Sequence, residues 1–151
     1  MAVESKVTCP ECGAVDGACE DHYNECLAKE FIDPAYFTVH HLTVAAYMVQ
    51  HSSKLTKQGW RFERGLLHEF LIEKKPPAFI RKQNRDVVDS GKRTFKIAEK
   101  NGLPKISRTH WTKTILDVRL GMDAEVYCAD VEAWAMSVLG EAEMVEIDAK
   151  S

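Results

Sequence analysis

The chain has 151 residues, of which 45% are hydrophobic and 28% charged, and its net charge at pH 7 is −3. This composition is typical of a globular protein and excludes a disordered or fibrous one, and the length suits a single domain over residues 1–151. The first residues lack the basic and then apolar run of a secretory signal, and the most apolar stretch, residues 34–53, contains histidine and glutamine side chains that a membrane span rarely carries. We therefore expect a cytoplasmic protein with no membrane segment.

Residues 1–17 are predicted to form a cysteine knuckle without regular secondary structure. Its centre is Cys9-Pro10-Glu11-Cys12-Gly13, in which two cysteines two residues apart can turn both thiolates toward one ion. The glycine suits the backbone conformation that such a turn requires. The alternative is a redox pair of the thioredoxin type, but the β-α-β pattern expected around such a pair is absent. We interpret the motif as half of a zinc site, because structural zinc takes four ligands.

Residues 18–73 are predicted to form a core of three helices. The first covers residues 18–31, where apolar side chains recur at helical spacing. An Asp-Pro pair then starts a second helix over residues 34–51, which is apolar on nearly every side. The third covers residues 56–73 and ends before two consecutive prolines.

Residues 74–108 are predicted to form a long basic loop region. Residues 74–113 contain 12 basic and 3 acidic side chains, whereas both ends of the chain are acidic. A short helix is expected at residues 84–89. The candidate contacts to a protein or nucleic-acid partner are Arg81, Lys82, Arg85, Lys92, Arg93 and Lys96.

Residues 109–140 are predicted to hold the C-terminal helices. A short apolar segment at 110–120, whose type stays open, precedes a strongly patterned helix over 124–139, which Asp123 caps and the next glycine ends. Residues 141–151 then form an acidic tail. These elements predict a mainly all-α fold, a small bundle of four to five helices with an N-terminal zinc knuckle and a long basic loop.

The remaining zinc ligands could be local or distant along the chain, and Cys19 with His22, or His22 with Cys26, has a spacing that could bind one ion. Local candidates are Cys19, His22 and Cys26, but Cys19 and Cys26 lie about 10.5 Å apart along one helix and cannot easily share an ion. If the first two helices form an antiparallel hairpin, His51 returns to the level of the knuckle, while His40 lies near the middle of the hairpin. His51 is therefore the best-placed distant ligand.

Several motifs of the chain occur together in one family. They are Cys9-Pro10-x-Cys12-Gly13, Cys19, Leu27-Ala28-x-Glu30, Val39-His40-His41-Leu42-Thr43-Val44-x-Ala46-Tyr47-x-Val49-Gln50-His51, Trp111-Thr112, Asp117-Val118 and Trp134-Ala135-x-Ser137-Val138. In these motifs, over residues 9–51 and 111–138, the chain resembles an uncharacterised bacterial family, the domain of unknown function 5946. The resemblance implies no particular activity.

The resemblance does bear on the metal ligands. It implies a site made by Cys9, Cys12, Cys19 and His51, because the family has apolar residues at the positions of His22 and Cys26. The family also places a histidine between the knuckle and the third cysteine, which this chain lacks, so His22 remains the second choice for the fourth ligand.

A further group of polar side chains is less specific. His40, Tyr47 and His51 share one face of the second predicted helix, where they could handle protons, with Glu30 or Asp33 supplying a carboxylate. The commoner role of such histidines is structural, with a single hydrogen bond in the core.

Three functions are compatible with these features. The first is a binding or regulatory module stabilised by structural zinc. The second is nucleic-acid binding through residues 74–113, against which the overall isoelectric point near 6.1 argues. The third is a thiol-based redox sensor or a metal-dependent enzyme. The common enzyme motifs are absent, which favours a protein that is not an enzyme, and no catalytic residue is assigned.

Overall fold

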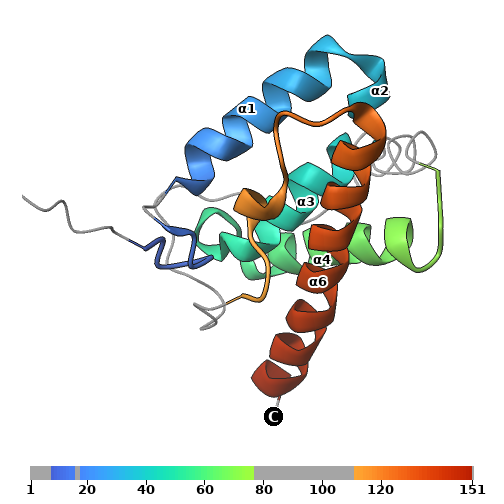
Figure 1. The fold of residues 1–151 in the computed structure, drawn as a ribbon. Coiled ribbons are helices and arrows are strands. Elements are labelled where there is room, and N and C mark those ends of the chain that lie inside the picture. The colour runs from blue at the N-terminus through green and yellow to red at the C-terminus, as the bar shows by residue number, and fades with distance from the viewer. Residues whose placement is uncertain (1–7, 16–17, 77–110, 151) are drawn as a thin grey trace, which may run out of the picture.

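The computed structural model describes residues 8–15, 18–76 and 111–150, and all regular secondary structure in this part of the chain is helical (Figure 1). The elements are the α-helices α1 (Cys19–Ile32), α2 (Pro34–Phe37), α3 (His40–Gln50), α4 (Lys57–Leu71) and α6 (Ala124–Lys150), and the 3₁₀ turns η2 (Ser52–Lys54) and η3 (Ile115–Asp117). No strand occurs among these residues, so the predicted all-α fold is confirmed. Nor does any helix among them combine the length and the apolar composition needed to cross a membrane.

The core forms where α3, α4 and α6 pack against one another. The long helix α6 lies across α3 and α4, while α1 packs on α3 and η3 (Figure 1). The side chains at the centre of this packing are fully buried, and they include Val49, Leu67, Tyr127, Val131, Trp134 and Val138. Burial of such apolar surface is the main favourable contribution to folding.

The single helix predicted over residues 34–51 is divided into α2 and α3. Thr38 Oγ1 donates a hydrogen bond to the carbonyl of Ala35 at 3.3 Å, and Val39 leaves helical geometry with φ −105° and ψ 11°. A threonine hydroxyl that binds the backbone in this way competes with the regular helical hydrogen bonds. The resulting bend places the start of α3 against α1.

The predicted end of the last helix at Gly140 is wrong. Asp123 Oδ1 accepts the amide of Val126 at 3.0 Å, as expected of a helix cap, but α6 then continues to Lys150. Ala142, beyond the glycine, is fully buried, so the packing of the helix does not stop at that residue. The stretch predicted as an acidic tail is therefore helical as far as residue 150.

From Trp111 onward, the segment that precedes α6 is irregular apart from one 3₁₀ turn. It contains η3, which begins with a capping box. The Asp117 side chain accepts the amide of Thr114 at 2.9 Å, and the Thr114 hydroxyl accepts the amide of Leu116 at 3.2 Å. The six basic side chains between residues 81 and 96 and the short helix predicted at 84–89 lie outside the described residues.

Candidate metal centre

Four buried side chains from three parts of the chain converge at one end of α3. They are Cys9, Cys12, Cys19 and His51, hereafter the Cys₃His group, and their sulfur and nitrogen atoms all lie within 4.8 Å of one another. The Nε2 atom of His51 lies 3.4 Å from Cys19 Sγ and 3.7 Å from Cys9 Sγ. The group could hold a metal ion.

The knuckle folds into a tight turn that aims two sulfurs inward. The amide of Gly13 donates to the carbonyl of Cys9, and the amide of Cys9 donates to the carbonyl of Ala14, both at 2.9 Å. Gly13 has φ 83°, a conformation that side chains with a Cβ rarely adopt. The glycine after Cys12 is thus required by the turn, as the sequence predicted.

The orientation of His51 is set by the end of α3. The residue follows Gln50 at the C-terminus of the helix, and its Nδ1 atom donates to the carbonyl of Tyr47 at 2.7 Å. Its ring also stacks on the Tyr47 ring at a centroid distance of 4.0 Å. A proton held on Nδ1 leaves the lone pair of Nε2 facing the sulfurs, which is the usual arrangement behind a metal-bound histidine.

Glu11, which the sequence analysis did not single out, ties the knuckle to the rest of the fold. Its two carboxylate oxygens accept hydrogen bonds from the amide and the hydroxyl of Ser53, at 2.8 and 2.7 Å. Its backbone carbonyl accepts the indole N–H of Trp111 at 3.0 Å. The knuckle is therefore held from both sides by residues that are 42 and 100 positions away in sequence.

Burial disfavours negative charge on all three thiols, and it raises the pKa of two of them. Burial raises the pKa of Cys12 well above its ordinary value, and for Cys19 burial and the hydrogen bond to Cys9 act in the same direction. Burial also opposes ionisation of Cys9, but backbone hydrogen bonds from Cys12 and Glu11 outweigh it and lower the pKa of that thiol. A bound cation would supply the compensating charge, because thiols bind metals as thiolates and release their protons.

The donor set fits a small tetrahedral ion. Sulfur atoms bound to one zinc at about 2.3 Å lie less than roughly 4 Å apart, which is close to the spacing within the Cys₃His group. Three thiolates and one imidazole are ligands that suit zinc, and they are poor ligands for calcium or magnesium, which prefer oxygen.

The other ligands considered from the sequence lie elsewhere. His22 Nε2 donates to the carbonyl of Val118 at 2.6 Å. Cys26 is fully buried and hydrogen-bonded to Tyr127, and burial raises the pKa of its thiol to about 11. Neither residue belongs to the Cys₃His group.

A second buried polar cluster surrounds Glu30, where α1 meets α3 and α6. Glu30 Oε1 accepts from His40 Nδ1 at 2.8 Å, and Oε2 accepts from Thr43 Oγ1 and the Tyr127 hydroxyl, both at 2.6 Å. His40 and His51 thus serve different clusters rather than one proton-handling face. In the sequence, this cluster is indicated by the position of Glu30, which lies four residues after Cys26 on the buried face of the first helix.

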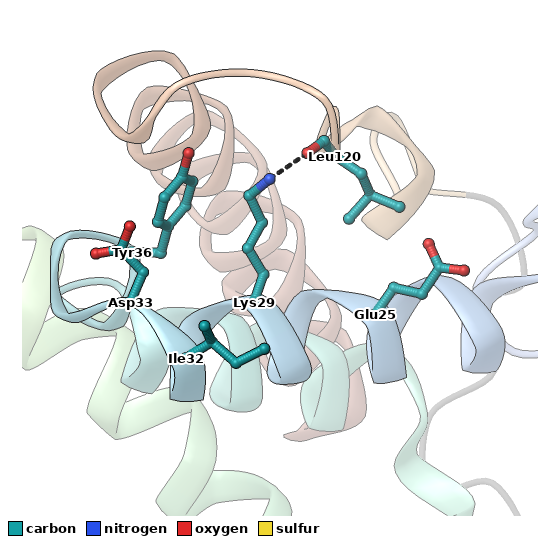
Figure 2. Close-up of a pocket in the computed structure, with 6 residues that line it drawn as sticks. All are labelled: Glu25, Lys29, Ile32, Asp33, Tyr36 and Leu120. Atoms are coloured by element: carbon teal, nitrogen blue, oxygen red, sulfur yellow. Dashed lines mark hydrogen bonds between the residues drawn. The ribbon is translucent and has the colours of Figure 1, made fainter.

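An open hollow of about 430 Å³ lies between α1, the start of α2 and the loop before α6 (Figure 2). Within it, the Lys29 ammonium points to the carbonyl of Leu120, donates a hydrogen bond to it, and lies 4.7 Å from the centre of the Tyr36 ring. Asp33 accepts the amide of Ala35 at the start of α2. Lys29 therefore stabilises the loop before α6, and Asp33 stabilises the start of α2.

Comparison with known protein families identifies this chain's similarity to one of them. A family model described as a family of unknown function, DUF5946, matches residues 7–143. No curated protein and no solved structure matches the chain.

Proposed function

We propose that this chain, which belongs to the family of unknown function DUF5946, is a metal-binding helical protein in which the Cys₃His group holds one structural zinc ion. The observation that supports the proposal is the convergence of three cysteines and one histidine, all buried, from the knuckle, the start of α1 and the end of α3. Burial disfavours free thiolates, so a bound cation would compensate the charge that these cysteines carry as ligands.

A structural role is favoured over catalysis. Three thiolates and an imidazole complete the four-ligand set of structural zinc, whereas a catalytic zinc keeps one position open for water or substrate. All four side chains are also shielded from solvent. The ion would join the N-terminal residues to the helical core and contribute its binding free energy to folding. The protein is then a binding or regulatory module, with zinc maintaining its shape.

The test is the metal content of the purified, reduced chain, measured by mass spectrometry. We expect about one zinc per chain in the wild type and almost none in Cys19→Ser and His51→Ala. Replacing zinc with Co²⁺ should give the visible absorption of a tetrahedral ion with thiolate ligands. A wild-type protein without metal would overturn the proposal.

The controls separate ligation from general damage. His22→Ala removes the rival fourth ligand, and Cys128→Ser removes a thiol on α6, far along the chain from the Cys₃His group. Both variants should keep their zinc. Loss of zinc in His22→Ala with retention in His51→Ala would reassign the fourth ligand.

The other functions remain predictions from the sequence. The basic side chains proposed to contact nucleic acid lie outside the described residues. A redox sensor would gain little from Cys26, because that thiol is buried and its raised pKa keeps it protonated near neutral pH.

A further inference from the structure

Residues 111–113 are attached to two of the three parts of the chain that carry the proposed metal ligands, the knuckle and the end of α3. Trp111 is 4% exposed, and its indole N–H donates at 3.0 Å to the carbonyl of Glu11, which lies between Cys9 and Cys12. The contact therefore depends on a backbone atom inside the knuckle.

The second attachment is made by the residue that precedes His51. Gln50 is 1% exposed, and its side-chain N–H donates to the carbonyl of Lys113 at 2.7 Å. Its Oε1 atom accepts the indole N–H of Trp134 on α6 at 3.1 Å, which fixes the direction of the amide. Trp111 and Lys113 are thus hydrogen-bonded to Glu11 and Gln50. These two residues directly precede the proposed ligands Cys12 and His51 in the sequence.

The knuckle has little of its own to keep these contacts in place. Its described residues, 8–15, are mostly turn and irregular chain, and a segment of this length buries too little apolar surface to be ordered by itself. Its position depends on the Cys₃His group, on the hydrogen bonds of Glu11 to Ser53, and on the indole N–H of Trp111 that the Glu11 carbonyl accepts.

We propose that occupancy of the Cys₃His group controls the docking of residues 111–113, which is held with the ion bound and released when the ion is lost. This inference rests on the proposed function and adds a regulatory role to it. Residues 111–113 end the basic segment 74–113, so the state of the ion would determine whether that end is fixed to the fold. The hydrogen bonds of Thr112 to Glu141, at 3.0 and 2.8 Å, are exposed and connect to α6 rather than to the metal site. They would keep Thr112 near α6 without keeping Trp111 buried.

The first test is amide hydrogen exchange on the full chain, with its metal content measured before and after chelation. We expect chelation to raise exchange in residues 9–15 and, in the same samples, at the indole N–H of Trp111 observed by NMR, while residues 127–138 of α6 stay protected. Unchanged protection of the Trp111 indole N–H after complete metal loss would overturn the inference, and so would simultaneous loss of protection throughout the chain. A wild type that binds no ion would overturn both this inference and the proposed function, whereas bound ion with unchanged protection would overturn only this one.

The second test uses the reciprocity of linked equilibria. If the ion favours docking, docking must favour the ion by the same factor, so Trp111→Phe, which removes the N–H, should weaken zinc affinity roughly five-fold in competition with a chelator. Thr112→Val removes a contact to α6 and should leave the affinity unchanged. Equal affinities for Trp111→Phe and the wild type would contradict the inference.

Discussion

Glu30 is a carboxylate placed in the core of the molecule, where it is 1% exposed. It is tolerated there because three donors from α3 and α6 satisfy its oxygens, namely His40, Thr43 and Tyr127. Burial and the hydrogen bond to Glu30 raise the pKa of Tyr127, so this residue remains an O–H donor. The cluster fixes α1 to the other two helices by directional contacts.

Glu30→Gln should therefore destabilise the protein more than an ordinary polar substitution. The amide replaces one acceptor with an N–H₂ group that faces other donors, and we expect the free energy of unfolding to fall by about 2–4 kcal/mol. Urea denaturation measures the change. Glu25→Gln on the exposed side of the same helix is the matched control and should stay within about 0.5 kcal/mol of wild type. Equal unfolding midpoints for the two variants would contradict a stabilising role of the cluster.

Glu63 on α4 predicts a pH dependence of stability. The side chain is 9% exposed, and burial raises its pKa from 4.5 to about 7. Between these values the folded state holds a proton that the unfolded state has released, so stability falls as the pH rises from about 4.5 to about 7, by about 3 kcal/mol in total. Above about pH 7 Glu63 is ionised in both the folded and the unfolded state, so it causes no further loss of stability.

Glu63→Gln should remove this contribution. The measurement is the difference in free energy of unfolding between Glu63→Gln and wild type at about pH 5 and about pH 8, in which pH effects common to both proteins cancel. We expect the free energy of unfolding of Glu63→Gln, relative to that of wild type, to be higher at about pH 8 than at about pH 5. A difference that does not change with pH would show that Glu63 does not titrate in this range.

At the scale of the elements, the start of α6 could be predicted from the sequence, but its end could not. Asp33 and Asp123 accept backbone amides two or three residues ahead, which is a local interaction with a clear residue signature. Gly140 has the signature of a helix end, yet α6 continues through it because buried contacts such as that of Ala142 outweigh the helical cost of a glycine, about 1 kcal/mol.

Two glycine substitutions should therefore act in opposite directions. Gly140 is in a helix, and a Cβ there would meet no atom within 4 Å, so Gly140→Ala should raise the free energy of unfolding by about 0.5–1 kcal/mol. Gly13→Ala should lower it by about 1 kcal/mol or more, since Gly13 has a positive φ. Thermal unfolding of both variants checks the signs. A destabilised Gly140→Ala would place the end of the helix at that glycine after all.

For the whole molecule, the Cys₃His group acts as a link between distant parts of the chain. If this group holds an ion as proposed, removing the ion should lower the melting temperature and reduce stability by on the order of a few kcal/mol, because only the folded state brings all four side chains together. Differential scanning calorimetry with and without a chelator measures the effect. The metal-free variants Cys19→Ser and His51→Ala provide the control, since chelator should not change their melting temperatures.

How much of this architecture the sequence could predict depends on the separation of the residues involved. Cys9 and Cys12 share a motif of four residues, and His51 followed from the length of two helices and from a family resemblance. Glu11 and Trp111 are 100 residues apart, and no local sequence pattern indicates that they are in contact. Glu30 and Tyr127 are 97 residues apart, and only packing brings them together.

The spacing of the ligands along the chain also bears on the denatured state. Cys9, Cys12 and Cys19 lie within eleven consecutive residues, whereas His51 is 32 residues beyond the last of them. An unfolded chain thus retains three thiolates close together and competes for the ion, and the stabilisation of the native state depends on the ratio of the two affinities. Added zinc should therefore raise the melting temperature only to a plateau. During refolding, the cysteines can capture the ion first, and the arrival of His51 then closes the remaining loop.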